Sequence, residues 1–136
     1  MVNLGILTLT NSTVSARFGG SSGMFNFSDT VTLNRTLVSG NTAPTGPEIA
    51  NSTTNSAIIN ADNFNLFGHS GVAGVSGFAP GVTDVVPGAG VMLNNILSPL
   101  ASNGGPTLTH ALVTGSPAID ASPGPTRYHA APRGRL

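Results

Sequence analysis

The sequence predicts an all-β protein, built as a β-solenoid of about three coils and completed by an irregular C-terminal cap. Three observations lead to this prediction: a composition rich in turn and strand residues, short segments of apolar–polar alternation, and a repeat with an offset of 24 residues. The 136 residues include 14 Ser, 15 Thr, 13 Asn, 18 Gly and 10 Pro but no Lys, a balance that disfavours helices. The apolar fraction of 39% suffices for the core of one domain.

Two segments carry the repeat and align without a gap. Residues 7–16 read LTLTNSTVSA, and residues 31–40 read VTLNRTLVSG. Apolar residues alternate with Thr in both, which is the pattern of a half-buried strand, and the alternation breaks at Asn11. Each copy therefore predicts a strand, a corner and a second short strand. Stacked copies would place Leu9 on Leu33 and Val14 on Val38 in continuous apolar columns.

A weaker third copy is expected at residues 56–68, with an offset near 26. One coil cannot bury its own apolar face, so about three coils are needed for stability, and residues 1–70 hold three at most. We therefore expect the N-terminus to be a cut end of a longer array, whose neighbouring coils are its natural partners. Unpaired strand amides at an open edge also predict self-association.

The loss of the repeat near residue 70 predicts the organisation of the domain. Residues 1–70 form the coils, residues 71–99 form an irregular segment rich in Gly, Pro and Val, and residues 100–121 form the C-terminal cap motif of the same domain. Residues 122–136, SPGPTRYHAAPRGRL, are expected to be a disordered or non-native tail.

The cap segment predicts two tight turns joined by a short alternating strand. Gly residues supply the positive φ that each turn needs, and the strand between them spans residues 107–112. We interpret His110 and Asp120 as polar braces within the cap rather than catalytic groups, because no nucleophile or second acid lies at a fixed spacing. The candidate motif residues are Asn103, Gly104, Gly105, Pro106, Thr109, His110, Gly115, Ser116, Pro117 and Asp120.

This block also resembles a known family. Residues 100–121, LASNGGPTLTHALVTGSPAIDA, are similar to the C-terminal signature of bacterial choice-of-anchor Q domain proteins, and residues 39–49 and 64–68 fit upstream parts of it. The resemblance covers most of residues 7–121. It implies a right-handed parallel β-helix in a secreted or cell-surface protein, hence an extracellular location, and a structural, adhesin-like role without catalysis. Residues 122–136 depart from the family, whose members continue with a final strand and an anchor.

Composition narrows the function classes further. The formal net charge is zero and no basic stripe exists, which disfavours nucleic-acid partners. There is no Cys, and His69, His110 and His129 are too widely spaced for a zinc motif. Residues 71–91 have a loop composition rather than that of a membrane span, and the start of the chain does not read as a signal peptide. We expect no cofactor, no metal and no enzymatic activity.

Three alternatives remain open from the sequence. A carbohydrate-active β-helix enzyme, either a polysaccharide lyase or a glycoside hydrolase, would need acids stacked from successive coils, for which Asp29, Glu48 and Asp62 are the candidates. A glycan-binding module without catalysis is the second, although one Tyr and six Phe offer few stacking platforms. Ice binding through Thr-x-Thr pairs at residues 8–10 and 30–32 is the third.

Overall fold

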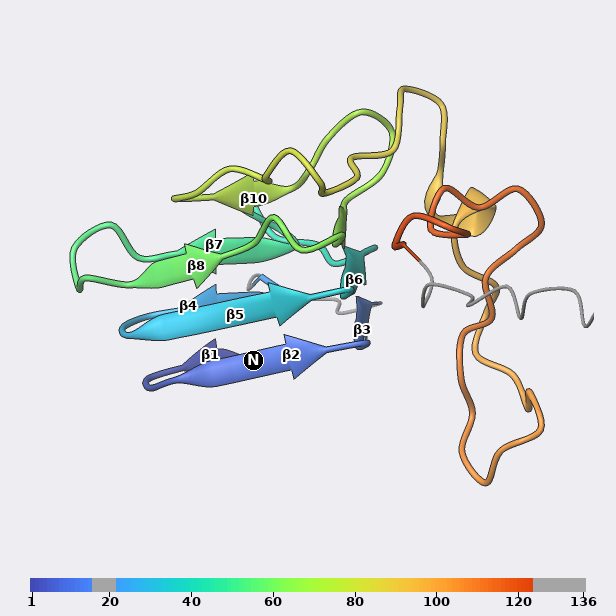
Figure 1. The fold of residues 1–136 in the computed structure, drawn as a ribbon, viewed down its shortest axis with the longest axis horizontal. Coiled ribbons are helices and arrows are strands. Elements are labelled where there is room, and N and C mark those ends of the chain that lie inside the picture. The colour runs from blue at the N-terminus through green and yellow to red at the C-terminus, as the bar shows by residue number, and fades with distance from the viewer. Residues whose placement is uncertain (16–21, 124–136) are drawn as a thin grey trace, which may run out of the picture.

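A computed structural model describes residues 1–15 and 22–123 and shows an all-β protein of parallel strands in three stacked sheets (Figure 1). The first sheet has the order β1-β4-β7-β10, the second β2-β5-β8 and the third β3-β6-β9. The strands of the first sheet are β1 (Val2–Asn3), β4 (Met24–Asn26), β7 (Ile49–Asn51) and β10 (Val75–Ser76). Those of the second are β2 (Leu7–Thr10), β5 (Thr30–Asn34) and β8 (Ile58–Asn60), and those of the third are β3 (Thr13–Ser15), β6 (Leu37–Ser39) and β9 (Leu66–Phe67).

The chain visits the three sheets in turn, and we call one such circuit a pass. In the second and third sheets, the first two passes pair at the predicted offset of 24. Leu9 lies opposite Leu33, and Val14 lies opposite Val38. The third pass lies where the weaker copy was expected, but the offset of 26 was wrong. Ile59 lies opposite Val31, and Phe67 opposite Val38, which gives offsets of 28 and 29. Most of the shift arises because the connection at residues 52–57 is three residues longer than the connection at residues 27–29 of the pass before.

The core lies inside the stack, between the three sheets. The apolar residues that alternate with Thr point inward, so that each column of side chains continues from one pass to the next. The core side chains are completely buried in the middle of the stack and partly buried in the first pass, where Leu7, Leu9 and Val14 pack against the buried core from one side. The fully buried members are Met24, Val31, Leu33, Val38, Ile49 and Phe67.

Each pass turns at three corners, which we number by position: the first corner joins the first and second sheets, the second joins the second and third, and the third leads back to the first sheet. At the second corner, Asn11 and Arg35 adopt φ of 50° and 48°. One left-handed residue redirects the strand within a very short connection, and Asn tolerates this conformation better than most residues. The break in alternation at Asn11 therefore marked a corner.

The end of the stack beyond the third pass is covered by residues 71–91. β10 pairs with β7, and Val85 forms a parallel bridge with Leu66, so pairing extends past residue 70. Phe78 packs edge-on against Phe67, with ring centroids 5.9 Å apart. This segment therefore lies over the core and over the last strands of two sheets.

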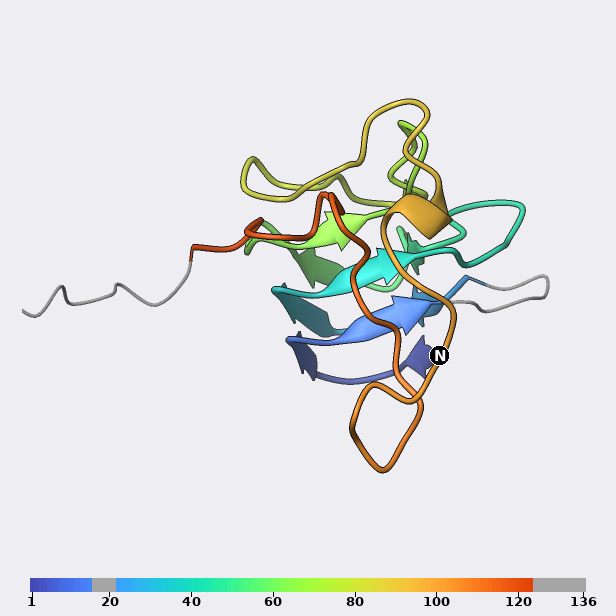
Figure 2. The same ribbon diagram turned by 90° about the vertical axis from the view of Figure 1, so that its right-hand side faces the viewer.

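The chain then descends along the outside of the third sheet (Figure 2). The 3-10 helix η1 (Leu93–Asn95) precedes Ile96 and Leu97, which pack against the outward side chains Leu37 and Leu66. Antiparallel bridges join Leu97 to Leu112 and Ala101 to Thr109, which makes residues 97–112 a hairpin-like arm. Both views show this arm reaching beyond the first pass of the stack. Of the expected tail, residues 124–136 lie outside the described residues.

Candidate functional site

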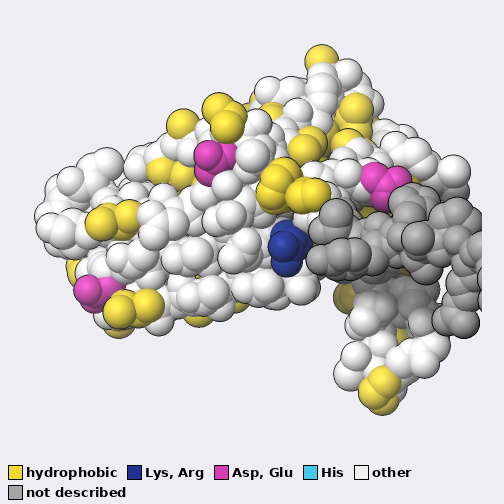
Figure 3. All heavy atoms as spheres, in the orientation of Figure 1, with side chains coloured by type: hydrophobic (Ala, Val, Ile, Leu, Met, Phe, Trp, Pro, Cys, Tyr) yellow, Lys and Arg dark blue, Asp and Glu magenta, His cyan; other side chains and the backbone are white. Residues whose placement is uncertain are grey.

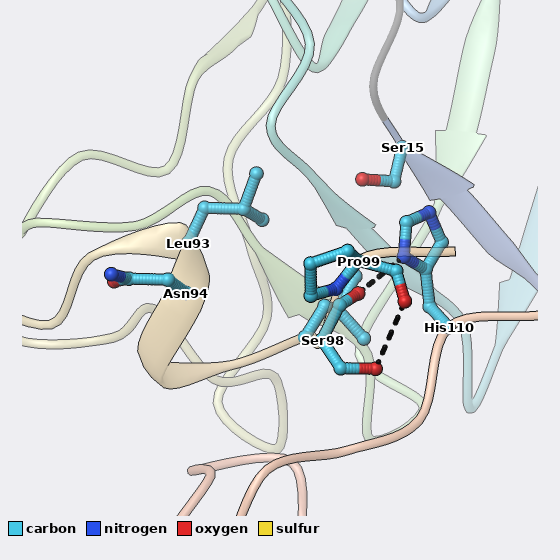
Figure 4. A pocket seen from close by; sticks show the side chains of 7 residues that line it. Ser15, Leu93, Asn94, Ser98, Pro99 and His110 are labelled. Carbon is cyan, nitrogen blue, oxygen red and sulfur yellow. Dashed lines mark hydrogen bonds between the residues drawn. The ribbon is translucent and has the colours of Figure 1, made fainter. Parts of the chain in front are cut away.

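A groove runs between the third sheet and the hairpin-like arm (Figure 4). β3 supplies Ser15 to one wall, while Leu93, Pro99 and His110 line the other side. Two adjoining hollows extend the groove along Thr13 and Leu108 and along Asn11 and Leu112. The lining combines aliphatic carbon with hydroxyl groups, the amides of Asn11 and Asn94, the Arg35 guanidinium and the His110 imidazole.

His110 is held by the opposite strand of the arm. Its Nδ1 lies 2.6 Å from the Ser98 carbonyl oxygen, and since a carbonyl only accepts, Nδ1 carries the proton. The Ser98 Oγ accepts the Ala111 N–H at 3.0 Å, and the Ser98 N–H donates to the Ala111 carbonyl at 2.8 Å. In the neutral form of this imidazole, Nε2 is then the acceptor. Across the groove the Ser15 Oγ is buried and has no hydrogen-bond partner among the described residues.

The third corner of the second pass contains a buried carboxylate. Glu48 is 1% exposed and accepts hydrogen bonds from the N–H groups of Gly40 (2.9 Å) and Asn41 (3.3 Å) and from Asn41 Nδ2 (2.6 Å). Burial raises the pKa of Glu48, while the hydrogen bonds from Asn41 and Gly40 and the nearby charge of His69 act in the opposite direction. Its Cγ also fills the space above Gly74, where a Cβ would approach it to 2.6 Å. Glu48 thus connects the third corner of the second pass to the third corner of the pass that follows.

A second carboxylate cluster holds the covering segment onto the second corner. Asp84 accepts five hydrogen bonds, from the N–H groups of Asp62 (2.8 Å), Asn63 (3.2 Å), Asn65 (2.9 Å) and Gly81 (2.9 Å) and from Asn65 Nδ2 (2.9 Å). Asp62 reciprocates, because its Oδ1 accepts the N–H and the hydroxyl of Thr83. These hydrogen bonds from Thr83 lower the pKa of Asp62. The sequence interpretation missed this role of Asp84, whose only signal was a lone acid in a Gly/Pro-rich segment.

The three acids proposed for a carbohydrate-active site do not come together. Asp29 lies at the first corner, between β4 and β5, and Asp62 lies at the second corner, after β8. Glu48 lies directly before β7, at the third corner. A glycosidase pair requires two carboxyl groups facing one another across a scissile bond. These acids instead occupy three different corners of the stack.

A column of Asn side chains inside the first corner was also missed. Asn3 donates to the Asn26 Oδ1 at 2.8 Å, and Asn26 donates to the Asn51 Oδ1 at 2.9 Å, so the amides form a ladder along the stack. Asn26 is fully buried and also donates to the carbonyls of Asp29 and Ile58. The sequence signal for this ladder was the spacing of Asn3, Asn26 and Asn51, which are 23 and 25 residues apart.

The cap motif residues lie on the arm and just after it, where they shape turns. Gly104 and Gly115 adopt φ of 92° and 79°. Asn103 donates to the Thr109 carbonyl at 2.8 Å and to its hydroxyl at 3.0 Å, which closes the arm. Ser116 is buried, its carbonyl accepts the Ile119 N–H at 3.0 Å, and Asp120 is exposed with a φ of 56°. Gly105, Pro106 and Pro117 lie within the same turns.

The Thr pairs do not form a continuous ladder. Thr8 lies opposite Thr32, but Thr10 lies opposite Asn34, and the third pass places Ile58 against Thr30. Thr32 in turn lies opposite Asn60, so each of these columns of Thr residues is interrupted within the three passes, and the regular Thr array that ice binding would need is not formed.

Comparison with protein-family models, with curated proteins and with solved structures gave no match. Within residues 1–15 and 22–123, no group of three or more His, Asp or Glu side chains is arranged to hold a metal ion. The same part of the chain has no helix with the length and apolar character to cross a membrane.

Proposed function

We propose that the chain is a structural, non-catalytic segment of a parallel β-helix protein, displayed outside the cell and adhesive through its polar flanks. The passes would be coils of a right-handed β-solenoid, and residues 100–121 its C-terminal cap. Resemblance of residues 100–121 to choice-of-anchor Q domain proteins supports the secreted or surface location.

The observation that carries this proposal is the continuity of the interior columns. The aliphatic columns and the Asn ladder run through successive passes, so every buried group in them serves the stacking of one pass on the next. The face over β2, β5 and β8 shows few charged groups and isolated hydrophobic ones (Figure 3). The outward Thr and Asn residues of these strands lie side by side and offer hydroxyl and amide groups, which suits weak, repeated contacts with a hydrated polymer.

The placement of the acids supports the non-catalytic interpretation over the enzymatic one. Glu48 is fully engaged by amide donors inside a corner, and Asp62 by Thr83 at another. In the groove, the lining residues supply hydroxyl groups, the Asn94 amide and the His110 imidazole. General acid–base cleavage of a glycoside needs a facing carboxyl pair, which this arrangement of acids does not provide.

The proposal is tested by immobilising a panel of polysaccharides, including pectin and alginate, and measuring both retention and turnover of the purified chain. We expect retention of the chain without release of reducing or unsaturated sugar ends. Turnover that disappears in Glu48→Gln or Asp62→Asn would overturn the proposal in favour of an enzyme. If none of the immobilised polysaccharides retains the chain, the proposed adhesive role is wrong.

The location is tested independently with antibodies raised against this chain. They should label intact cells of the source organism. Labelling that appears only after the cells are permeabilised would contradict surface display.

A further inference from the structure

Arg35 carries the only Lys or Arg charge within residues 1–15 and 22–123. All five Asp and Glu residues lie in the same part of the chain, yet none of them forms an ion pair with Arg35. Its Nε donates to the Ser122 Oγ at 3.1 Å, while its two terminal nitrogens have no partner among the described residues. Arg35 therefore keeps its positive charge and most of its N–H donors for an acceptor from outside the chain.

This guanidinium lines a hollow of the groove between the second corner and the arm. Asn11 and Thr13 of the first pass line one side of the hollow, and His110 and Leu112 of the arm line the other. The volume of about 300 Å³ is at the lower end of the range of small-molecule sites. Because two passes and the arm enclose it from the side, the hollow belongs to the lateral face of the stack and does not depend on either end.

The other polar side chains of the hollow also lack partners. The Asn11 amide and the Thr13 hydroxyl make no hydrogen bond to a described residue. The Ser98 carbonyl occupies Nδ1 of His110, and no described residue engages Nε2. Leu112 is 44% exposed and adds an apolar surface. The hollow thus combines one cation, hydrogen-bonding groups of both polarities and exposed aliphatic carbon.

A sugar acid matches each part of this combination. Its carboxylate pairs with a guanidinium, its hydroxyls bond to amide, hydroxyl and imidazole groups, and its C–H face packs on aliphatic carbon. A simple anion would use Arg35 alone, and a neutral sugar would leave the guanidinium without a counter-charge. The carboxylates of Asp62 and Asp84, at the second corner of the next pass, are already engaged by N–H and hydroxyl donors.

We propose that this hollow binds a uronate unit of an acidic polysaccharide, with the carboxylate of the sugar on Arg35. The inference rests on the proposed adhesive function and names the chemical class of polymer that the chain retains. The hydroxyl-binding groups around Arg35 favour a sugar over the acidic side chains of a peptide, because a peptide carboxylate would leave them unused.

The test compares galacturonate oligomers with their methyl esters by titration calorimetry on the full chain. We expect the acid form to bind about fivefold more tightly than the ester, the size of a well-formed surface ion pair, and to lose this advantage in high salt. Arg35→Gln should bind acid and ester alike. Arg133→Gln is the control, since it removes the same charge at a position outside the described residues and should keep the preference.

A second variant tests the hydroxyl-binding part of the hollow. Thr13→Val removes one hydroxyl at nearly constant volume and should weaken binding of the acid form about threefold. Thr53→Val is the matched control, because Thr53 is an exposed Thr in the connection at residues 52–57 and should leave binding unchanged. Circular dichroism establishes that each variant keeps its β-sheet signal.

The outcomes separate this site from the adhesive function. Equal binding of acid and ester by the parent chain, or a preference for the acid that survives Arg35→Gln, would overturn the site and leave the adhesive function in place. A loss of the same size in Arg133→Gln would assign the preference to net charge and overturn the site as well. Tighter binding of a poly-glutamate peptide would overturn the assignment to a sugar. Retention by no polysaccharide would overturn the adhesive function together with this site.

Discussion

Leu33 and Leu9 offer a direct measure of how much the stacking of passes stabilises the fold. They are the same residue type, they lie opposite one another in adjacent strands, and they differ in position along the stack. Leu33 is 0% exposed, with a pass on either side, whereas Leu9 lies in the first pass and is partly buried. Truncating each to Ala therefore compares an internal position with a terminal one while the chemistry stays constant.

The expected magnitude follows from burial. Leu33→Ala removes three carbons, and at about 0.8 kcal/mol per buried methylene the transfer contribution is about 2.4 kcal/mol. Incomplete collapse of the resulting cavity raises the loss in unfolding free energy to about 3 to 4 kcal/mol. Leu9→Ala should cost about 1 to 2 kcal/mol, because part of that side chain already contacts water and its cavity opens to solvent.

The assay is urea unfolding followed by circular dichroism, performed at low micromolar protein concentration. Both variants should keep the m-value of the parent chain, so that the shift in midpoint reports stability alone. Equal losses for the two variants would refute the reasoning, since Leu9 would then be as enclosed as Leu33.

Three further predictions concern the polar groups of the interior and the corners. Asn26→Ala should lower the unfolding free energy, measured by urea unfolding, by about 3 kcal/mol, because the truncation leaves Asn3 and neighbouring carbonyls without their buried partner. A loss no larger than that caused by truncating an exposed Asn would contradict the stabilising role of the Asn ladder. Asp84→Ala should lower the unfolding free energy by about 2 kcal/mol and speed hydrogen exchange at Asp62, Asn63 and Asn65, whose amides donate to Asp84. Asp120→Ala, on an exposed turn, is the control and should change neither quantity. Equal effects of the two variants would contradict the role assigned to Asp84. Glu48 has a folded pKa raised above its ordinary 4.5, so the protonated acid is favoured in the folded state and the unfolding free energy should fall as the pH rises from 4.5 through the folded pKa. Glu48→Gln should lack this fall in unfolding experiments across the same pH range, and an unchanged pH profile would argue against the buried carboxyl.

The sequence predicted the stacking well where one pass repeats the other without insertion. The alternation around Leu9 and Leu33 reflects a strand with one face inside, and the left-handed corner at Asn11 interrupts it visibly. The Gly residues of the arm likewise indicated turns, because few other residues adopt a positive φ. These features are local, so a short window of sequence contains them completely.

The remaining features depend on contacts between segments that are distant along the chain. Leu37 and Val38 are adjacent apolar residues, which indicates a strand buried on both faces, but nothing local shows that Ile96 and Leu97 cover the outer face. The clamp of Asp84 likewise depends on amides about 20 residues earlier. The Asn ladder requires the correct register of three passes before its members align.

The longer connection at residues 52–57 has a consequence for how such a chain tolerates variation. Three added residues relative to the pass before displace no core side chain, since Ile59 and Phe67 still fall onto their columns. Each strand is positioned by the layer beneath it and hardly at all by the length of the link that precedes it. Insertions in the connections between strands can thus give rise to new recognition loops, while selection acts separately on the hydrophobic interior.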